Sequence, residues 1–200
     1  MRDGWFINTK GFSLVDAMMG IGVGVTVIMA TTSVLLSYDK GLTVTNAVAT
    51  RDNLVDEVKS VGSNYNYLQN LAAGPGNGLL KKCLTGGGCT SVGGAQPLTL
   101  YAASAASANL ALSGPPGAGK FYDISGQPCV GAKTCPFQLT TSFLAQCAAN
   151  PPMIMVPPSS CPGPPDVVQI IYTIQQVNPL GSDNITLPTF TGTILVQGPN

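Results

Sequence analysis

Histidine is absent from this 200-residue chain, and charged residues make up only 9% of it. Without histidine, the chain lacks the commonest general base and the commonest zinc ligand in proteins. Nine basic residues balance nine acidic ones, so no bulk positive field supports nucleic-acid binding. No residues form a recognisable nucleophilic triad. The sequence therefore supports no enzyme assignment and predicts no cofactor and no metal site.

One long stretch, from Ala17 to Leu36, lacks charge altogether. As a helix it would extend about 30 Å, the thickness of the hydrocarbon core of a bilayer. Arg2 and Lys10 precede it, which indicates that the N-terminal end stays in the cytoplasm. Asp16 stands at its head, although an ionised carboxylate deep in lipid would cost roughly 2.5–3.5 kcal/mol. The sequence predicts a single membrane span followed by an exported region.

All six cysteines follow this span. An even number of cysteines on the exported side is typical of disulfides formed in an oxidising compartment such as a bacterial periplasm. Two pairs have the form C-x5-C, and the simplest pairing is local: Cys83 with Cys89, Cys129 with Cys135, and Cys147 with Cys161. Other connectivities stay open. A zinc site is disfavoured, because zinc-binding cysteines usually lie closer together in the sequence and no histidine can complete a set.

The residues at the head of the span form a specific pattern, Lys10-Gly-Phe-Ser-Leu-Val-Asp16, followed by the apolar run. This pattern resembles the N-terminal processing signal of type IV prepilins and of the related type II secretion pseudopilins. The resemblance implies that a membrane peptidase cuts after Gly11 and that the new N-terminal Phe12 is N-methylated. It also implies that Asp16 pairs with the α-amine of a neighbouring subunit. Family members usually carry Glu there, and the shorter Asp favours a minor or specialised subunit over a major one.

The resemblance also divides the chain and implies its partners. It implies a leader peptide over residues 1–11 and the transmembrane and assembly half of a long helix over 12–38. The amphipathic half of the helix covers 39–73, and a disulfide-containing, β-rich head covers 74–200. The implied partners are the prepilin peptidase, other pilin subunits, an inner-membrane assembly platform and, before assembly, membrane lipid. The implied location is the bacterial inner membrane and then a periplasmic or cell-surface filament.

Beyond residue 39, apolar residues recur at the spacing of a helix that packs against a folded domain: Leu42, Ala47, Val48, Leu54, Val55, Val58 and Val61. We expect one helix from Phe12 to Val61, about 75 Å long. Gly62-Ser63-Asn64 is the expected break, and Tyr65–Ala73 adds a further turn or two. Many family members have a proline in this helix, whereas this chain has glycines, and Gly20-x-x-x-Gly24 permits close contact between helices.

The rest of the chain predicts loops followed by strands. Residues 74–136 are rich in Gly, Ala, Ser and Pro, which favours loops and short strands tied down by disulfides. Within them, Gln96–Ala102 is expected to be a strand, and 102–112 a short helix or a surface loop. Alternating apolar and polar residues predict strands over Phe137–Phe143 and Val168–Gln175.

A turn over Asn178–Asn184 precedes the last predicted strand, Ile185–Val196, which Pro188 interrupts or confines to a sheet edge. Its core-facing residues are expected to be Phe190, Ile194 and Val196. The predicted fold class is α+β, a long N-terminal helix packed on a small antiparallel sheet. This is also the pilin-like fold that the resemblance implies.

One segment matches a nucleotide-binding motif. Gly114-Pro-Pro-Gly-Ala-Gly-Lys120 has the form G-x-x-x-x-G-K, but Phe121 follows it in place of the Ser or Thr that holds magnesium. The residues after it are not typical of a helix, which a phosphate-binding loop should open. We interpret the match as chance in a Gly- and Pro-rich chain. Near the C-terminus only Asp183 is acidic, so the calcium site of some major pseudopilins is not predicted.

The leading hypothesis is a non-enzymatic, minor pilin-like subunit of a type IV pilus-type filament, assembled by helix packing. Its Gly- and Pro-rich head suits an exposed surface that adheres, binds DNA or caps a filament. One alternative is a type II secretion pseudopilin, and another is a membrane-tethered periplasmic binding module that does not polymerise. A cleaved secretory signal is disfavoured, because the candidate site Ala47-Val48-Ala49 lies well past the end of the apolar run.

Overall fold

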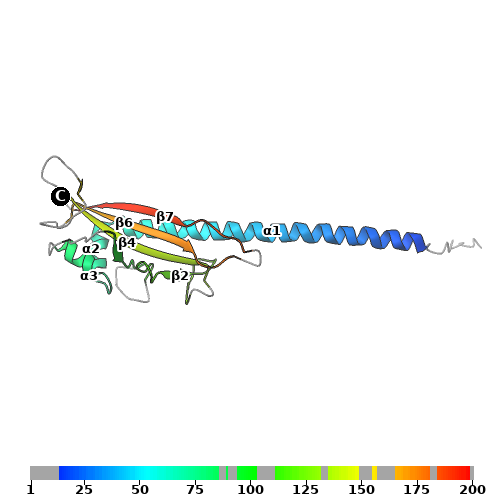
Figure 1. Cartoon of the computed structure of the whole chain (residues 1–200), viewed down its shortest axis with the longest axis horizontal. Coiled ribbons are helices and arrows are strands. Elements are labelled where there is room, and N and C mark those ends of the chain that lie inside the picture. Colours follow the sequence, from blue (N-terminus) through cyan, green and yellow to red (C-terminus); the bar gives the residue numbers. More distant parts are fainter. Residues whose placement is uncertain are drawn as a thin grey trace, which may run out of the picture. The chain divides into compact units, whose positions relative to one another are not determined.

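The computed structural model describes residues 14–85, 89, 94–102, 111–131, 135–148, 155–156, 165–180 and 184–198. The chain divides into two compact units, Met1–Leu42 and Thr43–Asn200. Helix α1 (Leu14–Gly62) contributes its first part to one unit and its last part to the other (Figure 1). The long helix predicted from the sequence is therefore confirmed from Leu14 onward, and the start predicted at Phe12 lies outside the described residues.

In the first unit, α1 is strongly apolar. It is the one helix among the described residues that is long and apolar enough to cross a membrane, and its most apolar stretch has no buried residue. A signal sequence near an N-terminus meets the same criterion. Hydroxyls in this part donate to carbonyls three or four residues earlier, at Thr26, Thr31, Thr32, Ser33 and Ser37. These internal bonds satisfy the hydroxyls without water, as a helix in lipid requires.

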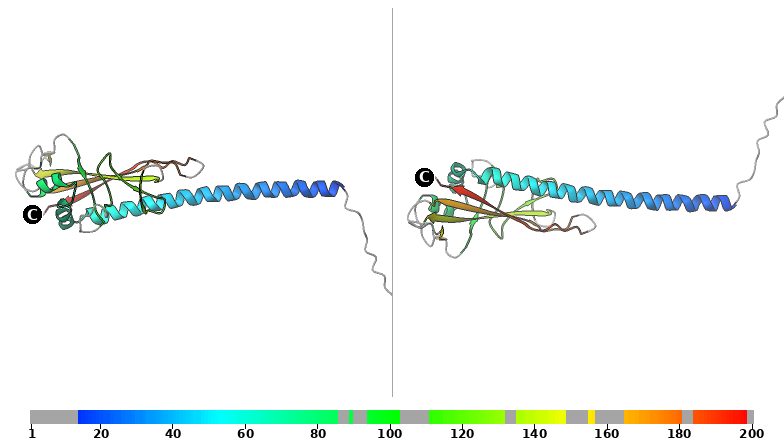
Figure 2. Two further views of the ribbon diagram at one scale, coloured as in Figure 1. Left: turned by 90° about the horizontal axis from the view of Figure 1, so that it is seen from below. Right: turned by 90° about the horizontal axis from the view of Figure 1, so that it is seen from above.

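In the second unit, residues 43–62 of α1 lie along one face of a sheet (Figure 2). The side chains that α1 buries there recur at helical spacing: Ala47, Thr50, Leu54, Val55 and Val58. A Cβ atom at Gly62, where the helix ends, would lie 2.8 Å from Ile194 Cδ1, so a side chain there would require Ile194 to shift. Asn64 then caps α2 (Tyr65–Ala72) by accepting a hydrogen bond from the Tyr67 backbone nitrogen at 3.3 Å. The predicted break and extra turns are confirmed.

Among the described residues, the sheet of the second unit has seven strands in the order β3-β2-β4-β6-β7, with β1 and β5 also paired to β4. Every strand pair is antiparallel. The strands are β1 (Gln96–Leu98), β2 (Lys120–Tyr122), β3 (Pro128–Cys129), β4 (Phe137–Ala148), β5 (Met155–Val156), β6 (Val167–Gln176) and β7 (Phe190–Gln197). The long helix and the small antiparallel sheet make this an α+β chain, as predicted.

Alternate residues of the three long strands form the core beneath α1. Cross-strand pairs on this face with both residues buried include Leu139–Ile174, Phe143–Ile170 and Val168–Val196. Phe190 and Ile194 of β7 are partly buried and pack against this core. Ile171, which breaks the alternating pattern in the sequence, lies on the opposite face and is partly exposed. The strand predicted from Ile185 begins only at Phe190, because Pro188 cannot donate a ladder hydrogen bond.

A short helix, α3 (Gly78–Leu84), corrects the prediction of loops and short strands in this region. The fully buried Asn77 precedes α3, and its side chain joins the start of α3 to the end of α2 and to the residue after β1. Its Nδ2 donates to the carbonyls of Leu71 and Thr99, at 3.0 and 2.8 Å, and its Oδ1 accepts from the Thr99 nitrogen at 2.9 Å. Tertiary contacts stabilise this helix, so its composition alone does not predict it.

The strand expected over Gln96–Ala102 is confirmed only for the three residues of β1. Tyr101 forms an isolated antiparallel bridge with Ala111, and that bridge lies outside the named strands. The helix or loop expected over 102–112 falls mostly on 103–110, which lie outside the described residues. The structure therefore corrects the length of this strand.

Candidate functional site

The first unit presents a continuous apolar surface. Its large apolar side chains, from Leu14 to Leu42, have exposed fractions between 44% and 78%. A Cβ atom added at Gly20, Gly22 or Gly24 would meet nothing within 4 Å, so the backbone is open there. An apolar surface of this extent is expected to be covered by lipid or by other apolar helices, and glycines let a second helix approach closely.

Of the residues predicted for processing and assembly, Asp16 lies within the described part of the chain. It is in the first turn of α1, two residues after Leu14. The positive end of the helix dipole favours a carboxylate at this position. Gly11 and Phe12, the predicted cleavage and methylation residues, lie outside the described residues.

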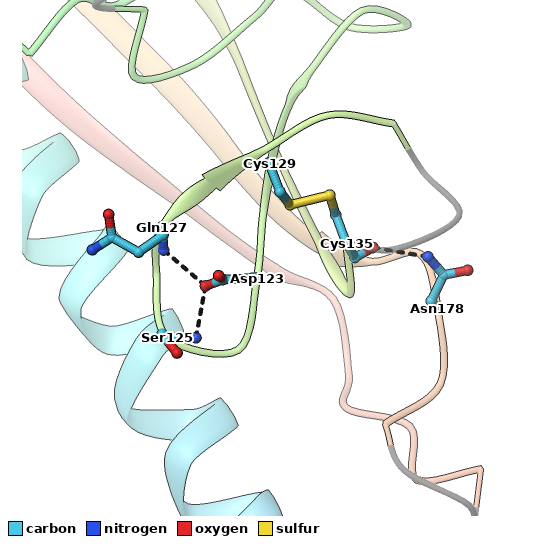
Figure 3. Close-up of a disulfide and its surroundings, with 6 residues drawn as sticks. All are labelled: Asp123, Ser125, Gln127, Cys129, Cys135 and Asn178. Carbon is cyan, nitrogen blue, oxygen red and sulfur yellow. Dashed lines mark hydrogen bonds between the residues drawn. A yellow bond between two sulfur atoms is a disulfide. The ribbon is translucent and has the colours of Figure 1, made fainter.

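Both C-x5-C pairs form disulfides, Cys83 with Cys89 and Cys129 with Cys135. Figure 3 shows the second disulfide between the end of β3 and the residues before β4. The Asn178 side chain donates a hydrogen bond to the Cys135 carbonyl at 2.8 Å and so joins the segment after β6 to this disulfide. The predicted pairing of Cys147 with Cys161 lies outside what the structure describes. Disulfides in the head fit an oxidising compartment.

The turn between β2 and β3 is held by one carboxylate and by α1. Asp123 Oδ1 accepts hydrogen bonds from the backbone nitrogens of Ser125 and Gln127, at 2.8 and 2.9 Å (Figure 3). The buried Thr50 of α1 donates its hydroxyl to the Ile124 carbonyl at 2.6 Å. Asp123 therefore has a local structural role. Within the described part of the chain, no three potential metal-ligating side chains of His, Cys, Asp or Glu gather.

The segment resembling a phosphate-binding loop packs tightly against β4. It leads into the strand β2 and not into a helix, which supports its interpretation as a chance match. A Cβ atom at Gly114 would lie 2.0 Å from the Ala118 carbonyl oxygen, and one at Gly119 would lie 2.6 Å from Thr140 Cγ2. Close packing of the backbone thus accounts for both glycines without a nucleotide.

Three tyrosines anchor the head through their hydroxyls. Tyr67 donates to the Tyr101 carbonyl, Tyr101 to the Pro75 carbonyl at 2.7 Å, and Tyr122 to the Leu112 carbonyl at 2.5 Å. Burial raises the pKa of each of the three phenols. They remain protonated donors and are not suited to proton transfer near neutral pH.

A pocket of about 290 Å³ opens beside α1 in the second unit. Its polar lining comes from Glu57 of α1 and Gln127 of the β2–β3 turn, and its apolar lining includes Leu112, Tyr122 and Pro128. In the sequence, Glu57 lies within the helix expected from Phe12 to Val61, and no motif singles it out. No local pattern indicates this pocket, because its other walls come from segments far along the chain that the sheet brings to α1.

A scan against protein-family models matches no family to this chain. Searches of curated proteins and of solved structures likewise find no match. Its function must therefore be inferred from its own residues and their arrangement.

Proposed function

We propose that this chain is a minor pilin-like structural subunit of a bacterial type IV pilus-type filament. A prepilin peptidase cuts it after Gly11, Phe12 is N-methylated, and subunits assemble by packing the apolar halves of their α1 helices. One observation carries the proposal. The pattern Lys10-Gly-Phe-Ser-Leu-Val-Asp16 precedes an uncharged run in the sequence, and the described helix α1 begins within the pattern at Leu14 and continues to Gly62.

The two halves of α1 suit this role. The first half exposes apolar side chains and satisfies its hydroxyls internally, so it is compatible both with lipid and with a bundle of apolar helices. Residues 43–62 pack against an antiparallel sheet in a head that contains two disulfides. This layout is compatible with a pilin-like subunit that is anchored in a membrane before assembly and carries an exported head.

Asp16 supplies the chemical selectivity of assembly in this proposal. Its carboxylate pairs with the α-amine of Phe12 on a neighbouring subunit, among apolar side chains. A buried charge is costly unless it is paired, so an incoming subunit is accepted in the register that brings amine and carboxylate together. The prepilin peptidase, the inner-membrane assembly platform and other pilin subunits are the partners that this role requires.

N-terminal mass spectrometry of the membrane fraction tests the proposal. The expected mature chain begins at N-methylated Phe12, because cleavage after Gly11 creates the amine that the assembly contact needs. An intact Met1 in cells with active prepilin peptidase would overturn the proposal in favour of a tethered, non-polymerising module. A chain that begins shortly after Ala49 would instead indicate a secretory signal.

Replacing Gly11 with Leu is expected to leave the chain unprocessed. A bulky side chain at this position blocks the cut that the resemblance places there, so the membrane fraction retains a precursor that begins at Met1. Whole-protein mass spectrometry measures the difference directly. Gly4→Leu, in the same leader but away from the cleavage site, is the matched control and should be processed as the wild type is.

A type II secretion pseudopilin shares the same N-terminal pattern and is the second candidate. Both candidates require cleavage after Gly11, so the location of the assembled protein separates them. Filaments that mechanical shearing releases from the cell surface support the pilus-type subunit. Assemblies confined to the periplasm support the pseudopilin.

A further inference from the structure

The pocket beside Glu57 combines one carboxylate with apolar walls. Leu112, Tyr122 and Pro128 contribute apolar surface, and Glu57 and Gln127 contribute the polar groups. The Tyr122 ring is buried, and its hydroxyl is engaged with the Leu112 carbonyl at 2.5 Å, so this wall is fixed. Burial and, secondarily, the nearby Glu57 carboxylate raise the pKa of Tyr122, which keeps the phenol neutral.

Glu57 has no cationic partner among the described residues. The ion pair on this stretch of α1 joins Arg51 to Asp52, with Arg51 Nη2 3.1 Å from Asp52 Oδ1. A carboxylate beside apolar walls is complementary to an alkylammonium group, whose methylene stem packs on the walls while its charge meets the acid. The lysine side chain has this chemistry.

The complementary surface lies on α3. Lys81 and Lys82 are adjacent, exposed and in the last turn of that helix, and neither has a carboxylate partner among the described residues. Lys59 lies on α1 two residues from Glu57, so it is on a different face of the helix, and it does not line the pocket. Lys120 is half-buried in β2, the strand that provides one wall of the pocket.

The two surfaces lie at different levels along α1 within the second unit. The Thr50–Ile124 hydrogen bond holds the β2–β3 turn near Thr50, whereas α3 packs with α2, which follows the end of α1 at Gly62. From Glu57, the α1 residue that lines the pocket, to Gly62 the helix rises about 7.5 Å. Figure 1 shows α3 near the C-terminal end of α1 and β2 further back along it.

We infer that the Glu57 pocket receives a lysine side chain of α3, Lys81 or Lys82, from a second copy of this chain. Two different surfaces then meet in a heterologous contact, which generates an open helical array, and not a closed dimer, when its rotation does not close into a ring. The contact joins copies staggered along α1 and selects their register, since complementary charge contributes more to specificity than to affinity. This inference rests on the proposed function, because it needs neighbouring copies in one assembly.

Charge reversal on either surface tests the contact in the full-length chain. Two variants reverse the charge on one surface each: the single variant Glu57→Lys, and the double variant Lys81→Glu with Lys82→Glu. Each is expected to lower the amount of this chain in sheared filaments by roughly tenfold or more, since like charges then face each other. All three substitutions together restore opposite charges and are expected to restore most of the incorporation. Asp56→Lys is the matched control, because Asp56 is an exposed carboxylate next to Glu57 that does not line the pocket.

A photo-reactive residue at Gln127 gives a second measurement that does not depend on reversed charges. The exposed Gln127 lies at the rim of the pocket, and the expected cross-link is to the Gly78–Leu84 peptide of a second copy, in a band of dimer size. If the wild type forms filaments and the charge-reversal variants are incorporated normally, this contact is wrong and the proposed function stands. The same holds if Gln127 cross-links only to peptides other than Gly78–Leu84. A reversal loss that the triple variant fails to restore also overturns it. Absence of wild-type filaments overturns both.

Discussion

Replacing Asp16 with Val is expected to leave cleavage after Gly11 intact and to remove most of the chain from sheared filaments. The substitution takes away the carboxylate that would neutralise the α-amine of a neighbouring subunit. Breaking one side of a buried ion pair costs about 3–5 kcal/mol, which corresponds to a loss of incorporation by roughly two to four orders of magnitude. Quantifying this chain in sheared filaments relative to the membrane fraction measures the effect.

Two further substitutions at the same position separate charge from shape. Asp16→Asn keeps nearly the same size without the charge and should fail as Asp16→Val does. Asp16→Glu keeps the charge on a side chain one methylene longer, so it should assemble at least as well as the wild type. Normal incorporation of the Val variant, with processing intact, would contradict the charge-pairing role and leave apolar packing as the source of selectivity.

The long helix and the two longest strands are predictable from the sequence because their signals are local. Uncharged residues from Ala17 to Leu36, followed by apolar residues at helical spacing, predict one long helix whose second part packs on a folded domain. In α1 the apolar side chains of the first part are exposed, and those at helical spacing in the second part are buried. Alternation in β4 and β6, which Ile171 interrupts, places one face of each strand in the core, and their register follows once α1 covers that face.

The rest of the head depends on contacts between distant segments. Helix α3 lies in a Gly-rich region, and the buried amide of Asn77 holds the turn before it to Leu71 and Thr99. Strand β2 follows a turn whose shape is set by contact with β4, which no pattern in residues 114–120 reveals. The Glu57 pocket also cannot be predicted from a local pattern, because α1 and a turn far along the chain form it together.

The C-x5-C disulfides are intermediate between these two cases. Short spacing makes a local pair the simplest choice, and Cys83–Cys89 and Cys129–Cys135 are both present. Their surroundings are not local, because Asn178 reaches the Cys135 carbonyl from the segment after β6. A sequence can thus propose a bond between nearby cysteines without indicating what that bond supports.

Substituting Gly114 with Ala should destabilise the head by about 3 kcal/mol, the upper part of the usual range for overpacking. The new Cβ atom would lie 2.0 Å from the Ala118 carbonyl oxygen, which is backbone and cannot swing aside. The turn that contains this carbonyl is closed by the Ala118 nitrogen donating to the Pro115 carbonyl at 3.0 Å. To remove this clash, Gly114 has to move. Its movement weakens the hydrogen bond in which its carbonyl accepts from the Thr141 nitrogen of β4 at 2.8 Å.

The measurement is urea unfolding of the full-length chain in detergent, followed by near-ultraviolet circular dichroism of the buried tyrosines. Gly78→Ala is the matched control, because a Cβ atom at Gly78 would meet nothing within 4 Å. Gly78 is also the first residue of α3, where Ala is a better helix former, so this variant should be as stable as the wild type or slightly more stable. Equal unfolding midpoints for both variants would contradict the view that close approach of the Ala118 carbonyl requires glycine at position 114.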